Sequence, residues 1–172
     1  MQLEAKGMHH TDPAKMNGKE FSIRVLKLDE LDRIFPVVER FFSETKDWTY
    51  LTFAPEKASK RMRDTVEYGF GRVLAGYAKA GEIAGYVILT YDDNFTVEIT
   101  ASIYSIYVLP EYRGTVLPRM LVNAATIAAK YDGAVNLHAQ ALNHLPRGGK
   151  TFLNLLTKQG FVPYAGGACK RL

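Results

Sequence analysis

The sequence predicts an α/β (α+β) fold, in which helices flank a mixed and mostly antiparallel β-sheet. Residues 97–108 are dense in β-branched and aromatic side chains, and the strand they predict stops before Pro110, which cannot donate to a sheet. Apolar residues then recur at helical spacing over 117–131. Two more strand-like segments flank Gly81, which predicts an antiparallel hairpin.

Hydrophobic periodicity and turn residues divide the chain into elements in the order β-α-α-β-β-β-α-β-α-β. The expected strands cover 21–28, 73–80, 82–91, 97–108, 134–140 and 161–170, and the expected helices cover 30–44, 55–68, 117–131 and 150–158. Residues 1–20 are polar and lack an apolar period, which predicts an extended N-terminal arm. Residues 21–172 are expected to form one domain, since a chain of 172 residues can bury a single core.

The first elements follow from alternation, caps and prolines. Apolar and polar residues alternate in the first strand, and one apolar face marks the helix after it. Asp29 is expected to cap that helix, while Pro36 predicts a late start or a kink. The aromatic-rich residues 46–53 are expected to form a short connection. Pro55 suits the first turn of the second helix, which Gly69 would end.

Turn residues also separate the later elements. Residues 79–82 carry a glycine at the predicted hairpin turn, and residues 92–94 favour a turn into the next strand. Asp132 and Gly133 are expected to end the long helix. Gly160 separates the last helix from the last strand. Each predicted boundary therefore has a local chemical signal.

The composition is that of a globular protein, with 47% hydrophobic and 23% charged residues. A net charge of +4 and an isoelectric point of about 9.1 suit a polyanionic ligand but do not by themselves indicate nucleic acid. Cys169 is the only cysteine, and no apolar run is long enough to span a bilayer. These features predict a soluble, cytoplasmic protein. His9 and His10 lack further ligands, so no metal is expected.

The stretch VLPEYRG, residues 108–114, closes the central strand and opens the long helix, and it resembles the acyl-CoA-binding motif of the GNAT-type N-acyltransferases. In that family an Arg or Gln is followed by a glycine-rich turn whose backbone amides hold the CoA pyrophosphate. Arg113 and Gly114 match this motif. Val116 stands at the second glycine and Pro118 at the last small position, so the turn departs from the family pattern.

The order of elements also resembles the GNAT fold over about residues 20–170, which implies a GNAT-like acyltransferase domain over 21–172 and acetyl-CoA as co-substrate. The resemblance places the pantetheine along the central strand, where it splays from its neighbour, and the pyrophosphate at the helix N-terminus, where unpaired amides favour anions. The residues thus implied for CoA are Ile106, Tyr107, Val108, Arg113, Gly114, Thr115, Val116, Leu117, Arg119 and Asn143. Because valine resists close backbone approach and Pro118 has no N–H, the sequence leaves open either weakened CoA binding or its loss.

Acetyl transfer to an amine needs a base for the amine and an acid for the leaving thiolate. Glu98 is one candidate base, and Glu111 acting through water is another. His138, in the expected strand 134–140, can exchange protons near neutral pH and is a further catalytic candidate. A histidine in a strand beside an apolar core is also often structural, so both interpretations of His138 stay open.

The general acid of the family is usually a tyrosine on the last helix, but Leu156 occupies that position here. Tyr104, Tyr107 and Tyr164 are therefore candidate substitutes, and Tyr104 is taken as a catalytic candidate. Cys169 has no histidine near it in sequence, so the sequence gives no reason to expect a cysteine nucleophile.

These residues together predict an N-acetyltransferase in which a bound amine attacks acetyl-CoA directly. The acceptor would be a small-molecule or peptide amine. The departures at Val116, Pro118 and Leu156 support an alternative, a GNAT-fold protein that has lost catalysis and serves as a binding or assembly module. Membranes and nucleic acids are not expected partners, and a homodimer is compatible with the sequence.

Overall fold

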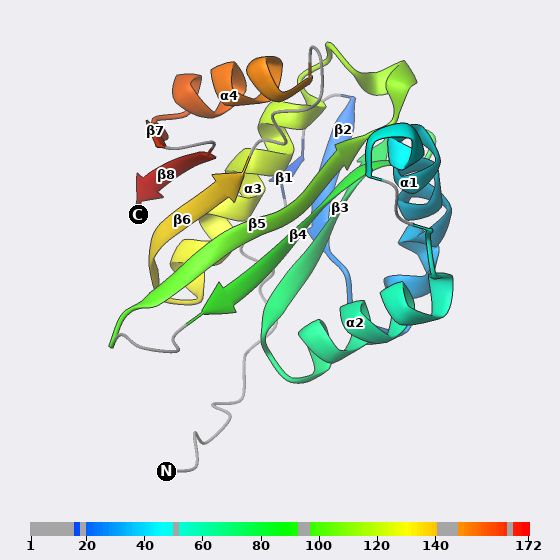
Figure 1. The fold of residues 1–172 in the computed structure, drawn as a ribbon, viewed down its shortest axis with the longest axis horizontal. Coiled ribbons are helices and arrows are strands. Elements are labelled where there is room, and N and C mark those ends of the chain that lie inside the picture. The colour runs from blue at the N-terminus through cyan, green and yellow to red at the C-terminus, as the bar shows by residue number, and fades with distance from the viewer. Residues whose placement is uncertain (1–15, 18–19, 50–51, 93–96, 141–147, 165–166) are drawn as a thin grey trace.

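A computed structural model of the chain describes residues 16–17, 20–49, 52–92, 97–140, 148–164 and 167–172. The described residues form an eight-stranded sheet in the order β1-β2-β3-β4-β5-β6-β8-β7 (Figure 1). Its strands are β1 (Met16–Asn17), β2 (Phe21–Val25), β3 (Gly71–Ala78), β4 (Ile83–Asp92), β5 (Ile99–Val108), β6 (Ala134–Gln140), β7 (Val162–Tyr164) and β8 (Gly167–Arg171).

Helices cover both faces of this sheet. α1 and α2 lie on one face, and α3 and α4 lie on the other (Figure 1). The helical elements are η1 (Leu28–Ile34), α1 (Phe35–Thr49), α2 (Pro55–Glu67), η2 (Pro110–Tyr112), α3 (Leu117–Tyr131) and α4 (Gly148–Lys158), where η denotes a 3-10 helix. None of the helices in the described part of the chain is long and apolar enough to cross a membrane.

The strand pairing confirms a mixed, mostly antiparallel sheet. Every neighbouring pair of strands is antiparallel except β5 and β6, which run parallel from Ile99↔Ala134 to Ile103↔Ala139. α3 provides the crossover that a parallel pair requires. The β4–β5 register shifts between Ile88 and Leu89, which leaves Tyr104 of β5 as the extra residue of a β-bulge.

Small residues set how closely α3 approaches the sheet. Alanines at 124, 125, 128 and 129 are fully buried between this helix and the strands. At the other end of the helix, a side chain placed on Gly76 of β3 would come within 2.7 Å of the Leu117 side chain. Gly76 therefore leaves the space in which Leu117 seats the N-terminus of α3 on the sheet.

An ion pair fixes the opposite end of α3. Asp132, which follows the helix, accepts hydrogen bonds from the Arg72 guanidinium on β3 at 2.5 Å and from the Tyr91 hydroxyl on β4. The Arg72 and Asp132 side chains are only 18% and 10% exposed. Both ends of α3 are thus tied to the sheet, and the orientation of its N-terminus is fixed.

Several boundaries differ from those the sequence predicts. The first helix is 3-10 up to Ile34 and becomes α-helical at Phe35, because Pro36 lies in the first turn of α1. Asp29 does not cap it, since η1 begins at Leu28 and its preceding residue is Lys27, whose N–H donates to the Glu30 carboxylate at 3.2 Å.

Two more expectations are corrected, and part of the expected N-terminal arm has a pairing partner. α1 continues to Thr49, so it includes part of the connection expected over 46–53. Part of the N-terminal arm, Met16–Asn17, pairs with β2 as β1. The expected last strand is two strands, β7 and β8, which pair with each other antiparallel. The turn expected at 92–94 lies partly outside the described residues.

Candidate active site

The loop between β5 and α3 forms one side of the candidate site. Leu109 donates its N–H to Ala84 of β4, and η2 then turns the chain toward Gly114, which has a φ of +83°. A positive φ in this range favours glycine, so this match to the family motif has a conformational reason. The loop therefore ends at the N-terminus of α3.

Part of the anion-binding capacity of this N-terminus is already used. The Thr115 hydroxyl donates to the Tyr112 carbonyl at 2.7 Å and accepts the Leu117 N–H at 3.2 Å. Pro118 has no N–H to offer. The backbone N–H groups of Val116, a residue that is 45% exposed, and of the exposed Arg119 have no hydrogen-bond partner among the described residues. The expected phosphate cradle is therefore reduced but retains donors.

Arg113 contacts α1 rather than the N-terminus of α3. Its Nε donates to the Val108 carbonyl at 3.0 Å, and its guanidinium lies 2.6 Å from a Glu44 carboxylate oxygen. The guanidinium is also 5.3 Å from the centre of the Tyr107 ring. The arginine that best matches the motif is thus held in a cluster with Tyr107 and Glu44.

Glu44 contacts both other members of that cluster. It also accepts the Tyr107 hydroxyl at 2.8 Å and lies 3.8 Å from Arg40. Burial raises the pKa of Glu44, but the hydrogen bonds from Arg113 and Tyr107 outweigh it, and the pKa is lowered overall. Burial and this same hydrogen bond raise the pKa of Tyr107, so its proton stays on the phenol. No sequence pattern pointed to Glu44, because its partners are far away in the chain.

The pairing between β5 and β6 ends in the middle of β5. Their pairing ends at Ile103↔Ala139, whereas β5 continues to Val108, with no further partner strand on that edge among the described residues. The bulge at Tyr104 marks the point where the separation begins. We call residues 104–108 of β5 the splayed segment, and it contains the residues expected along the pantetheine. Tyr107 and Val108 are each 7% exposed, and the Val108 carbonyl already accepts the hydrogen bond from Arg113.

The three catalytic candidates are placed differently. Glu98 is exposed and precedes β5, and the five residues to Ile103 span about 17 Å of extended chain. The structure therefore does not bring Glu98 to the splayed segment. Tyr104 lies at the bulge with 62% of its side chain exposed, and the Arg61 guanidinium is 5.8 Å from its ring centre.

His138 lies on β6 opposite Ser102, one residue before the last β5–β6 pair. Its Nδ1 is 3.2 Å from the Tyr164 hydroxyl, and its Nε2 is 3.5 Å from the Cys169 sulfur. The β6–β8 register places Cys169 directly opposite His138. The cysteine thus has a histidine partner after all, although its burial raises the pKa of the thiol and keeps it protonated.

The other residues considered for catalysis or CoA binding are Leu156, Glu111 and Asn143. Leu156 is fully buried in the core beneath α4, so its position can supply no proton. Glu111 is exposed on η2 and pairs with Arg40 at 3.3 Å. Asn143 lies outside the described residues. Within the described ranges, no group of three or more His, Cys, Asp or Glu side chains is arranged to hold a metal ion.

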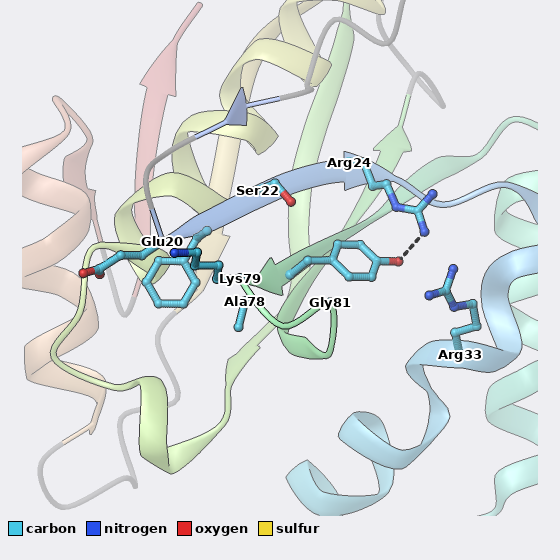
Figure 2. Close-up of a pocket in the computed structure, with 9 residues that line it drawn as sticks. Glu20, Ser22, Arg24, Arg33, Ala78, Lys79 and Gly81 are labelled. Atoms are coloured by element: carbon cyan, nitrogen blue, oxygen red, sulfur yellow. Dashed lines mark hydrogen bonds between the residues drawn. The ribbon is translucent and has the colours of Figure 1, made fainter.

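A hollow of about 410 Å³ opens between β2, β3 and the hairpin turn. Figure 2 shows Arg24 and Arg33 pointing toward one another at one end of it. Arg24 donates to the Tyr77 hydroxyl at 2.9 Å, and both guanidinium groups share one Glu30 oxygen, at 2.9 and 3.5 Å. Because Glu30 already pairs with both arginines, the hollow by itself identifies no ligand.

Comparison with known proteins gives a consistent result. The family model described as "Acetyltransferase (GNAT) family" matches residues 36–145. A putative phosphinothricin N-acetyltransferase superposes with a TM-score of 0.70 at 17% identity, covering 88% of this chain and 98% of its own. No curated protein matches this chain in sequence.

Two further structures are similar. An acetyltransferase of the GNAT family from Staphylococcus aureus Mu50 has a TM-score of 0.69 at 10% identity, over 88% of this chain and 99% of its own. An aminoglycoside acetyltransferase from an uncultured soil metagenomic sample has a TM-score of 0.67 at 18% identity, over 84% and 93%. At these identities the likeness concerns the fold.

Proposed function

This chain belongs to the acetyltransferase (GNAT) family, and on that premise we propose that it transfers an acetyl group from acetyl-CoA to an amine. The observation that carries the proposal is the splayed segment of β5, which leads directly into the N-terminus of α3. An unpaired strand edge offers hydrogen bonds to an extended pantetheine, and a helix N-terminus favours a pyrophosphate.

The donors for the CoA phosphates would come from what the loop retains. These are the unpartnered amides of Val116 and Arg119, with the Arg119 guanidinium beside them. Charge-assisted hydrogen bonds from arginine are about twice as strong as neutral ones. Arg113 would join them if it left Glu44, a rotation that breaks a half-exposed ion pair and releases its contacts with Val108 and Tyr107.

The reaction would proceed by direct attack. The neutral amine nitrogen forms a bond to the thioester carbonyl carbon, and the bond from that carbon to the CoA sulfur breaks. One proton leaves the nitrogen and one joins the sulfur, so the products are an amide and free CoA. Of the charged or titratable candidates, His138 lies opposite Ser102, two residues before the splayed segment, and would assist the proton transfers from there, while Glu98 lies far from that segment.

The acceptor would be a small-molecule or peptide amine. The similar structures include an aminoglycoside acetyltransferase, which supports an amine acceptor without identifying this one. Tyr104, exposed at the bulge, is suitably placed to contact it. Aromatic side chains hold ammonium groups through the ring face, although the attacking amine must be neutral.

A second candidate function is supported by the reduced cradle. Thr115 occupies the Leu117 amide, Glu44 holds Arg113, and Leu156 replaces the usual proton donor. A GNAT-fold protein with these features would serve as a binding or assembly module without catalysis.

Calorimetric titration with acetyl-CoA, with free CoA as control, separates the two functions. Micromolar binding is expected, followed by acetyl-CoA-dependent release of thiol when a panel of primary amines is supplied. Binding without thiol release by any amine in the panel would favour the binding module. Absence of both would overturn acetyl-CoA as co-substrate.

A further inference from the structure

Three polar side chains meet on neighbouring strands beside the splayed segment. Tyr164 of β7 and Cys169 of β8 contact the two ring nitrogens of His138 on β6. We call these residues the His138 network. Its hydrogen bonds are cross-strand contacts fixed by the β6–β8 and β7–β8 registers.

The network lies on the sheet face opposite α3 and α4. Leu137 and Ala139 are buried in the core beneath α3, so the alternation of a strand turns His138 to the other face. Ala168 is buried in the same core, which places Cys169 on the face of His138. Ile103 also belongs to that core, so Tyr104 at the start of the splayed segment projects to the same face as the network.

Gly167 allows the Tyr164 ring to reach across β8. A side chain placed on Gly167 would come within 3.2 Å of the Tyr164 hydroxyl and 2.8 Å of the Ala139 carbonyl. The ring lies edge-on to the His138 imidazole, with centres 5.7 Å apart. Tyr164 nevertheless remains 43% exposed, so its hydroxyl is held by His138 and still accessible to a ligand.

The distances allow an arrangement in which the protonated Cys169 thiol donates S–H to Nε2 of His138 at 3.5 Å. In that tautomer the ring proton resides on Nδ1 and is donated to the Tyr164 oxygen at 3.2 Å. Tyr164 thus receives a hydrogen bond on its oxygen, while its own O–H stays free to be given to another group.

The other candidate tyrosines lack this combination. Tyr107 is buried and donates its proton to Glu44. The Tyr104 hydroxyl has no hydrogen-bond partner among the described residues that would stabilise it once deprotonated. Leu156, at the position of the usual acid, is a core residue.

We propose that Tyr164 donates the proton to the CoA thiolate, in place of the tyrosine missing at position 156, and that His138 and Cys169 position it. This inference rests on the proposed function. As the carbon–sulfur bond breaks, the Tyr164 O–H proton moves to sulfur, and the phenolate is stabilised by the Nδ1–H of His138. The proton lost by the attacking amine then restores the phenol, so the cycle releases one amide and one CoA.

Kinetics of Tyr164→Phe test the proton donor, with Tyr68→Phe, an exposed tyrosine at the end of α2, as matched control. Loss of a general acid lowers kcat by at least about 100-fold. We expect that loss for Tyr164→Phe together with an unchanged Kd for acetyl-CoA. A Tyr164→Phe enzyme with the kcat of the wild type would overturn the proposal and leave the proposed function standing.

The positioning residues have separate tests. Cys169→Ser keeps an O–H donor for Nε2 and is expected to retain kcat within about threefold, whereas Cys169→Ala removes the donor and lowers it about tenfold. Nitrogen-15 NMR of wild-type His138 is expected to find the proton on Nδ1, a readout independent of activity. A proton on Nε2 would overturn the proposed arrangement. A wild type that acetylates no amine would instead overturn the proposed function and this role with it.

Discussion

At the scale of single residues, the loop after β5 shows how a motif can persist while its contacts change. Gly114 keeps the positive φ that the turn needs. Thr115 uses its hydroxyl to satisfy Leu117, and Arg113 turns toward Glu44. The backbone path is therefore retained, while fewer donors are left for a bound anion.

Replacing Arg113 tests whether it still serves CoA. We expect Arg113→Ala to raise the Kd of acetyl-CoA at least about tenfold, the effect of one lost charge-assisted contact. Glu44→Gln frees the guanidinium and is expected to leave the Kd equal or lower. Both are measured by calorimetry, with circular dichroism to verify folding. Equal affinity in Arg113→Ala and the wild type would exclude this arginine from the pyrophosphate site.

Replacing Val116 tests whether acetyl-CoA binding can be strengthened. Its φ of −75° does not require glycine, but its half-exposed side chain stands at the N-terminus of α3. Glycine is a better residue than valine before a helix and allows closer backbone approach to a ligand. Val116→Gly is expected to lower the Kd of acetyl-CoA several-fold, with Val97→Gly, a 98% exposed position outside the loop, as control. A weaker complex in Val116→Gly would show that the valine is compatible with the cradle.

At the scale of elements, α3 acts as a rigid connection between two anchored ends. Leu117 fits above Gly76, and Asp132 binds Arg72 and Tyr91. The helix N-terminus that would face CoA therefore keeps its orientation relative to β5.

Breaking the Asp132 anchor should destabilise the fold. Arg72→Met leaves a nearly buried carboxylate with one hydrogen-bond partner, and we expect the free energy of unfolding to fall by about 2–3 kcal/mol. Thermal unfolding should show a Tm about 5–10 °C lower. The matched control, Lys60→Met, breaks an exposed pair with Asp64 and should leave the Tm unchanged. Equal effects of the two substitutions would contradict a structural role for the anchor.

The sequence predicts elements well where the signal is local. Apolar spacing and capping signals set the bounds of α3 at Leu117–Tyr131, and alternation sets β6 at Ala134–Gln140, as predicted. The division of 161–170 into two strands was missed because it depends on the antiparallel pairing of β7 with β8, which local patterns do not encode. The His138–Cys169 contact was missed for the same reason, since a strand register joins residues far apart in the chain.

At the scale of the whole molecule, the sheet separates two hydrophobic cores, and helices leave part of one of its faces uncovered. α3 and α4 complete the first core, and α1 and α2 complete the second (Figure 1). On the sheet face that α1 and α2 cover, the part formed by β6 and β8 lies outside the second core. It carries polar side chains, including those of the His138 network. The loop motif could be predicted from sequence, but this open face follows only from the assembled sheet.

Buried tyrosines in both cores also make the stability of the protein depend on alkaline pH. Burial raises the pKa of Tyr86 to about 12, and burial raises the pKa of Tyr91 and of Tyr107 as well. An unfolded tyrosine ionises near pH 10, so above that pH the unfolded chain loses protons that the folded protein keeps. The free energy of unfolding is therefore undiminished by these groups below pH 10 and falls as the pH rises toward 12, by about 2–3 kcal/mol from Tyr86 alone.

Urea unfolding between pH 8 and pH 11.5 measures this decline, and substitution isolates its source. Tyr86→Phe cannot ionise, so its stability should fall less steeply than that of the wild type over the same range, whatever the lysines contribute to both. Tyr68→Phe, at a 64% exposed position, should follow the wild-type slope because it removes no buried phenol. If Tyr86→Phe and the wild type declined in parallel, the buried phenol would not be the group that links folding to pH, and the second core would have to admit water around Tyr86.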